Sequence, residues 1–375
     1  MNINSDCKST HCHDPVLESG RFQSGFSLIE IMVALTLSLF LIVGMIQLLI
    51  GNKQSYRVHD AQSRIQENGR FALEIFNHDM RMADFTGCPS GKEIDNVLNN
   101  PTDWWKNLGS SSVIGYDGTQ AFPGKAFGTG SGDRINGTDA IVIIKGSDSN
   151  YSIVSHNKNS AEFTLNGLPK IKNGSIMMGC NPSDYYTQIS VFQVKNASVN
   201  GATTIVSHGV GVVSPGNTTA TLGQIYGTNS IMIDFVPVAY YIGVSTSGSS
   251  RSLYQMRLTV TDAGVASMEA SELVEGVENM QIFYGQYSGT DKIIDPPYRD
   301  ASDVSKWSSV LSVRVNFLMT SLEDKLSTSL QTVTFPADTG DANTGGNVYT
   351  PVSTDRRLRQ TFSTTVGIRN RLPLL

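Results

Sequence analysis

Residues 21–30 read Arg-Phe-Gln-Ser-Gly-Phe-Ser-Leu-Ile-Glu, and Phe26 opens an apolar run that lasts to Ile50 with Glu30 as its only charge. At about 1.5 Å rise per residue, this run makes a helix of roughly 37 Å, which spans a bilayer with some tilt. A lone carboxylate in such a helix costs roughly 2.5–3.5 kcal/mol on insertion scales. The pattern therefore predicts a membrane-length helix whose single charge is kept for pairing, transport or assembly.

The order Gly25-Phe26-Ser27-Leu28-Ile29-Glu30 resembles the prepilin processing motif. The resemblance implies that prepilin peptidase cuts after Gly25 and that the new N-terminal Phe26 is methylated. It also implies that Glu30 acts in subunit assembly. A secretory signal differs, because its apolar core precedes the cleavage site. A plain signal anchor explains the apolar run by itself, but it has no use for the glutamate.

Basic residues around the apolar run bear on its orientation. They are Lys8 and Arg21 before it, and Lys53, Arg57, Arg64 and Arg70 after it. Taken literally, the positive-inside rule would keep the C-terminal part in the cytoplasm, but long domains translocate largely regardless of such charges. The processing motif needs a cytoplasmic leader. We therefore expect a single-pass inner-membrane precursor with its C-terminal domain in the periplasm, which later enters a pilus.

Charge and length limit the class of protein. The chain has 28 basic and 33 acidic side chains; without the two basic and three acidic residues of the leader, 26 and 30 remain. A net charge near −4 gives no sign of nucleic-acid binding. The mature chain is long enough for a large core beyond its helix. We expect a leader at 1–25, a transmembrane half-helix at 26–50, an amphipathic half-helix at 51–85 and a globular head at 86–375.

Two of the four cysteines, Cys7 and Cys12, lie in the leader, which leaves Cys88 and Cys180 in the mature chain. In an oxidising periplasm these two can form a disulfide that closes a loop of about 90 residues, worth roughly 4–5 kcal/mol in the chain-entropy model. Two unrelated buried thiols are the alternative, because sequence does not show whether the side chains meet.

The helix is expected to continue from Asn52 to about Asp84, where no proline interrupts it and Gly87 and Pro89 provide a stop. Apolar residues recur mostly at three, four or seven positions, as one buried stripe requires. The stripe consists of Val58, Ala61, Ile65, Ala72, Phe76, Met80 and Ala83.

After Cys88, short runs rich in Val, Ile, Phe and Tyr alternate with Gly, Ser, Asn and Asp clusters, which is typical of strands and turns. The expected strands are 140–145, 189–194, 231–244, 253–259, 280–284, 310–319 and 361–369. We therefore predict an α+β fold, in which a long N-terminal helix packs on a largely antiparallel, β-rich head.

Three C-terminal segments make the family resemblance more specific. They are Leu273-Val274-Glu275-Gly276-Val277-Glu278-Asn279-Met280-Gln281-Ile282-Phe283-Tyr284-Gly285, then Trp307 with the strand to Met319, and then Arg357-Leu358-Arg359-Gln360-Thr361-Phe362-Ser363-Thr364-Thr365-Val366 with Ile368-Arg369-Asn370-Arg371. These segments resemble PilW-type minor pilins, which are similar to GspJ-type minor pseudopilins of type II secretion. The resemblance implies a structural subunit that primes assembly at a pilus tip. Its implied partners are prepilin peptidase, other minor pilins, the major pilin, a pilus-tip adhesin and, before assembly, inner-membrane lipid.

Evidence for catalysis or cofactor binding is weak, and we expect neither an enzyme nor a cofactor. The six histidines are His11, His13, His59, His78, His156 and His208, and none sits in a metal or triad motif. The cluster from Cys7 to His13 looks metal-like but would be discarded with the leader.

Asp338-Thr339-Gly340 matches the tripeptide around an aspartic-protease carboxylate, but that chemistry needs two such aspartates. Asp338, Asp341 and Asn343 offer oxygen ligands for calcium, although their spacing does not fit an EF-hand and a solvated loop is the simpler interpretation. Three other functions remain open: a type II secretion pseudopilin, a membrane-anchored adhesin and an anchored hydrolase.

Overall fold

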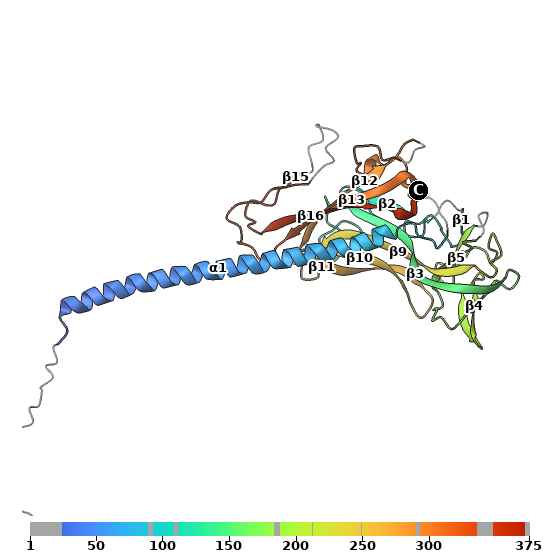
Figure 1. The fold of residues 1–375 in the computed structure, drawn as a ribbon, viewed down its shortest axis with the longest axis horizontal. Helices are drawn as coiled ribbons and strands as arrows, with labels where there is room; N and C mark the ends of the chain where they lie inside the picture. The colour runs from blue at the N-terminus through green and yellow to red at the C-terminus, as the bar shows by residue number, and fades with distance from the viewer. Residues whose placement is uncertain are drawn as a thin grey trace, which may run out of the picture. The chain divides into compact units, whose positions relative to one another are not determined.

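The computed structural model describes residues 25–88, 93–108, 112–183, 188–211, 213–248, 250–289, 293–335 and 348–371. The chain divides into two compact units, Met1–Tyr56 and Arg57–Leu375. Helix α1, Leu28–Arg81, contributes to both units (Figure 1). It ends slightly before the predicted position because Asp84 has a φ of 65° and its N–H donates to the carbonyl oxygen of Ile144, 3.0 Å away, on a neighbouring strand.

The predicted stripe on the second half of α1 is confirmed. Its buried members are Ala61, Ile65, Ala72, Phe76, Met80 and Ala83, whereas Val58 is half-exposed. Gly69 lies on the same stripe, and a Cβ at this position would stand 2.6 Å from the ring of Phe362. Gly69 therefore lets α1 approach the C-terminal strand closely, and this contact offsets the lower helix propensity of glycine.

The larger sheet runs in the order β1-β6-β5-β9-β3-β4-β8-β7, while β10 pairs with β9, β11 with β10 and β2 with β3. All pairs are antiparallel except β1 with β6. Its strands are β1 Ile94–Asn96, β2 Val113–Tyr116, β3 Ala140–Asn157, β4 Glu162–Asn166, β5 Ile176–Cys180, β6 Ile189–Gln193, β7 Asn196–Asn200, β8 Thr203–Ser207, β9 Ile231–Val244, β10 Arg251–Val260 and β11 Ala266–Glu275.

A second sheet has the order β12-β13-β16, and β14 pairs with β15 in a short ribbon. The strands are β12 Val277–Gln286, β13 Val310–Thr320, β14 Val333–Thr334, β15 Val348–Tyr349 and β16 Arg359–Gly367. Three short 3₁₀ helices also occur: η1 Ala301–Asp303, η2 Trp307–Ser309 and η3 Arg369–Arg371. The predicted α+β architecture, one long helix with a largely antiparallel β-rich head, is confirmed.

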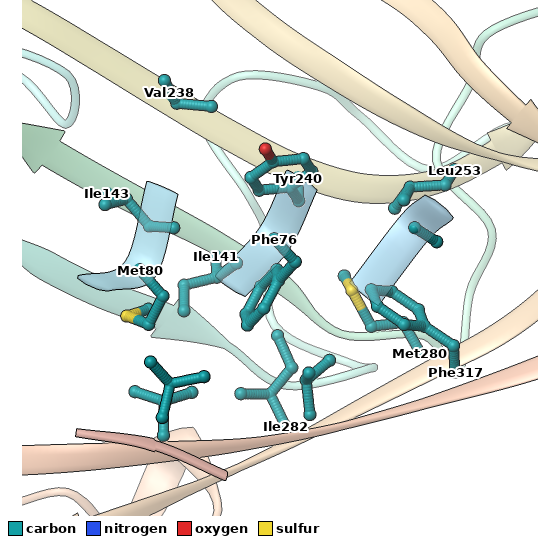
Figure 2. Packing of buried hydrophobic residues seen from close by; sticks show 14 of the residues in the cluster. Phe76, Met80, Ile141, Ile143, Val238, Tyr240, Leu253, Met280, Ile282 and Phe317 are labelled. Atoms are coloured by element: carbon teal, nitrogen blue, oxygen red, sulfur yellow. The ribbon is translucent and has the colours of Figure 1, made fainter. Parts of the chain in front are cut away.

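The main core lies where the outer half of α1 meets both sheets. Figure 2 shows Phe76 and Met80 between Val238 and Tyr240 of the larger sheet and Ile282 of the smaller one, all of them buried. The ring of Phe76 stands edge-on to Phe317, with centroids 5.9 Å apart, a favourable aromatic geometry. The apolar stripe of α1 therefore packs against both sheets.

Candidate processing and assembly site

The N-terminus of α1 is built by Ser27 and Glu30. The N–H of Ile31 donates to the carbonyl oxygen of Ser27 at 3.1 Å, which makes Ser27 the N-cap. The N–H of Ser27 donates in turn to Oε2 of Glu30 at 3.1 Å, which is one half of a capping box. Gly25 and Phe26 precede the helix and are exposed. Glu30 thus has a local role in starting the helix as well as the assembly role that we expect for it.

The apolar side chains that follow have no protein cover in the single chain. Every large apolar residue of 26–50 is exposed, from Phe26 at 84% to Val43 at 46%. An apolar surface of this extent marks a membrane or protein contact site. The first part of α1 is also long and apolar enough to cross a membrane, by length and composition.

The second half of α1 carries a buried acid, Asp79. Lys145 Nζ donates to Asp79 Oδ1 at 2.7 Å, and the hydroxyl of Tyr240 donates to Oδ2 at 2.5 Å. Gln255 Nε2 also donates to Oδ2 at 3.2 Å. Burial by itself would raise the pKa of Asp79, but the hydrogen bonds from Lys145 and Tyr240 outweigh it and the pKa is lowered. The helix is therefore fixed to β3, β9 and β10 by polar contacts as well as by apolar packing.

The C-terminal segment holds the residues that follow the same helix directly. Asn370 Nδ2 donates to the carbonyl oxygen of Ala83 at 2.8 Å, and Arg371 Nε donates to Asp84 Oδ2 at 2.9 Å. Arg371 Nη1 reaches the carbonyl oxygen of Trp307 at 2.7 Å. These contacts give the Ile368-Arg369-Asn370-Arg371 segment a physical role: it ties the residues just after α1 to η2 and to Val310 at the start of β13.

Two other segments of the C-terminal resemblance meet through a buried ion pair. Arg359 Nε lies 2.5 Å from Glu278 Oε2, and its Nη2 lies 2.6 Å from Asp355 Oδ2. The side chain of Arg359 is 0% exposed. Burial lowers the pKa of Arg359, but its bonds to Glu278 and Asp355 raise the pKa overall. The pair joins the start of β12 to the start of β16, on either side of β13.

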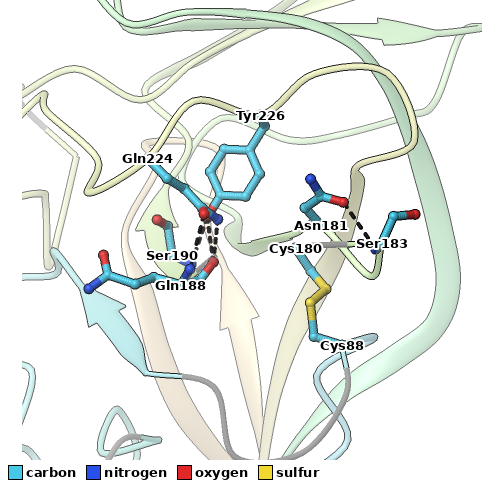
Figure 3. Close-up of a disulfide and its surroundings, with 8 residues drawn as sticks. All are labelled: Cys88, Cys180, Asn181, Ser183, Gln188, Ser190, Gln224 and Tyr226. Carbon is cyan, nitrogen blue, oxygen red and sulfur yellow. Dashed lines mark hydrogen bonds between the residues drawn. A yellow bond between two sulfur atoms is a disulfide. The ribbon is translucent and has the colours of Figure 1, made fainter. Parts of the chain in front are cut away.

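Cys88 and Cys180 form the expected disulfide (Figure 3). Their Cα atoms are 5.9 Å apart across a sequence separation of 92 residues. Cys180 ends β5, and Cys88 lies a few residues after α1. The bridge therefore connects the segment that follows the helix to β5, an inner strand of the larger sheet, and it closes a long loop of the unfolded chain.

We expect no free thiol in the denatured, unreduced mature protein, because the expected cleavage after Gly25 would remove Cys7 and Cys12. The paired variant Cys88→Ser/Cys180→Ser should lose about 4 kcal/mol of unfolding free energy, since the closed loop is about 90 residues long. Thiol titration and denaturant unfolding check these values. The matched control is the reduced native protein, which should lose a similar amount. Two free thiols in the unreduced protein would contradict the bridge.

One buried pair was missed by sequence reasoning. His156 Nε2 and His208 Nε2 lie 3.0 Å apart, beside Phe163 and Tyr226 in the small core around β4 and β8. Burial lowers the pKa of both histidines to about 4, so both rings are neutral at ordinary pH. No pattern at a separation of 52 residues could have indicated this contact.

The remaining candidates give no site in the described parts of the chain. There, no group of three or more His, Cys, Asp or Glu side chains is arranged to hold a metal ion. The leader cluster from Cys7 to His13 lies outside the described residues. So does the loop with Asp338, Asp341 and Asn343, and the calcium hypothesis stays a prediction.

Two family models match the chain. Residues 239–370 match PilW, type IV pilus-assembly protein W, and residues 20–46 match the prokaryotic N-terminal methylation motif. No curated protein and no solved structure matches. The first match runs from within β9 into η3 and so includes the Glu278–Arg359 pair and most of the C-terminal segment; the second spans the processing motif and the start of α1. Together the two matches support a type IV pilus-related, pilin-like protein, and they are consistent with the resemblance to PilW-type minor pilins.

Proposed function

We propose that this protein is a minor pilin, a structural and priming subunit of a type IV pilus tip complex. One observation carries the proposal: an exposed apolar helix begins at a prepilin-type motif and continues into a head with a PilW-type signature. By this proposal, prepilin peptidase removes residues 1–25 and the amine of Phe26 is methylated. The subunit then joins other minor pilins, the major pilin and a tip adhesin.

The exposed apolar side chains of 26–50 support a subunit that moves from the membrane into a filament. Lipid tails and the apolar helices of other pilins are similar in polarity, so moving from membrane to filament core costs little burial. We propose that the head lies in the periplasm before assembly. The Cys88–Cys180 disulfide supports this location, because such bonds persist in oxidising compartments.

The attachment of α1 to the head also fits a filament subunit. A helix held in a filament core must carry its head with it. Here α1 is fixed by Asp79 inside the core, and Asn370 and Arg371 hold the residues that follow the helix directly. The head is therefore held to α1 by polar contacts that are buried or half-buried. Water weakens such contacts less than exposed ones.

Glu30→Leu is expected to leave insertion and cleavage intact but to reduce co-purification with other minor pilins by more than about tenfold. In the filament we infer that Glu30 meets a Phe26 amine, its own or that of a neighbour. In the variant, the positively charged Phe26 amine would stay unpaired at low dielectric. This costs more than the roughly 1.4 kcal/mol that a tenfold change represents. Quantitative immunoblotting of affinity-purified minor pilins measures the effect.

The matched control is Glu30→Gln, which keeps a side-chain acceptor for the Ser27 N–H but removes the charge. Both variants should fail alike if the intersubunit charge matters. If Glu30→Gln assembles normally, neither the charge nor its interaction with the helix dipole is needed, and the role of this residue is the hydrogen bond that caps the helix. Undiminished capture of both variants would rule out the assembly role.

A further inference from the structure

The smaller sheet has two outer edges, and the residues that the structure describes cover one of them. Along β12, the N–H of Asp139 donates to the carbonyl oxygen of Met280 at 3.0 Å, and the N–H of Ile282 donates to Asp139 Oδ2 at 2.7 Å. Tyr284 exchanges two backbone hydrogen bonds with Arg299, at 2.8 and 3.0 Å. The outward backbone groups of β12 are thus satisfied by loops of the same chain.

The other edge is the free side of β16. The N–H of Ile368 donates to the carbonyl oxygen of Leu311 at 2.8 Å. The backbone N–H and C=O groups of the even-numbered residues of this strand therefore point toward β13. The backbone groups of the odd-numbered residues point away from β13. The N–H of Arg359, for example, donates to Gln331 Oε1 at 2.6 Å. The next outward residues are Thr361, Ser363, Thr365 and Gly367, all exposed. Among the described residues, their backbone groups have no hydrogen-bond partner.

This free edge lacks the usual protection against pairing. Natural edge strands carry charges, prolines or bulges, or are very short. From residue 360 to residue 367, β16 has no charged residue and no proline, and its register with β13 is continuous. By contrast, the edge strand β11 carries Glu269, Glu272 and Glu275, and its pairing with β10 has a register shift. The β16 edge is therefore a regular template for one more strand.

The surroundings of this edge indicate the charge of the added strand. Phe362 contacts α1 at Gly69, so a strand added to β16 would run beside the helix. There, a groove of about 740 Å³ is lined by Arg70, Leu73 and Arg81 of α1 and by Arg369 just after β16. Glu74 and Asp148 also line the groove, but the three arginines outnumber these two acids, so the net charge is positive. An acidic residue on the added strand would complement the arginines.

We propose that the β16 edge binds an extended, acidic segment of a neighbouring pilin subunit by strand addition. Main-chain hydrogen bonds to the four outward residues provide affinity, and the basic groove selects an acidic side chain. The inference rests on the proposed function, because it takes the neighbour to be another subunit of the same assembly. It adds a contact through the head to the contacts of the apolar helix.

Thr365→Pro is expected to disrupt this contact with little effect on the fold. Proline removes an N–H that points away from β13, so the ladder within the sheet stays intact. Thr365→Val is the matched control, since it keeps the N–H and the β-branched shape. A photo-crosslinking amino acid at Thr361 reports on the neighbour in pili of living cells. A crosslinker on the exposed turn residue Asp262 tests for random collisions.

We expect an adduct from position 361 that mass spectrometry assigns to an acidic, extended segment of another pilin subunit. Thr365→Pro should reduce its yield at least tenfold, whereas Thr365→Val should not. An adduct with a second copy of this chain, or none although the protein is present in pili, would overturn the inference. Absence of the wild-type protein from pili would instead overturn the proposed function, so the two failures are distinguishable.

Discussion

The variant Gly25→Val is expected to accumulate as an uncut precursor in the membrane and to be missing from pili. Glycine has no Cβ, so the peptide bond before Phe26 can approach the carboxylates of the peptidase closely, whereas a branched side chain blocks this approach. Gly25 precedes α1 and has no neighbouring atoms within 4 Å of its Cβ position, so the fold itself tolerates valine. Mass spectrometry of the N-terminus, in membranes and in purified pili, measures the outcome.

The control for this experiment is Gly44→Val, which makes the same change inside α1, where the Cβ position is also open. This variant should be cleaved normally, because the change lies far from the cut. Wild-type protein should yield N-methylated Phe26 as its first residue. Normal cleavage of Gly25→Val would refute the assignment of the processing site.

The elements that sequence predicted best are those whose own pattern is strong. The strand at 231–244 was predicted with the observed limits, because it is a long run of β-branched and aromatic residues. The outer half of α1 was equally clear, since its apolar residues repeat with the helical period. In both cases the local pattern and the tertiary environment favour the same structure.

The strands between residues 94 and 207 were mostly missed, and the reason is physical. β7 reads Asn-Ala-Ser-Val-Asn and is largely exposed, so it has almost no apolar pattern of its own. β4 and β8 bury two residues each and are strands because they pair with one another. Their apolar pattern is too short to stand out, and pairing partners cannot be identified from one sequence.

Long-range polar contacts could not be predicted for a related reason. Nothing near Glu278 indicates that it meets Arg359, 81 residues later, because the contact depends on both strands flanking β13. The disulfide was predictable because the expected cleavage after Gly25 would leave two cysteines, which reduces the possible pairings to one. A glutamate among 33 acidic side chains offers no comparable restriction.

Arg359→Met is expected to destabilise the head by about 3–5 kcal/mol, because it leaves the carboxylates of Glu278 and Asp355 buried without their cation. Methionine fills a similar volume, so the loss reflects charge rather than a cavity. Arg64→Met is the control: its partner Asp60 is 47% exposed, and such surface pairs contribute about 0.2–1 kcal/mol. Denaturant unfolding of the mature protein measures both values. Adding Glu278→Gln to Arg359→Met should recover part of the loss by removing one unpaired charge, whereas equal effects of the two arginine variants would show that the buried pair does not hold β12 and β16 together.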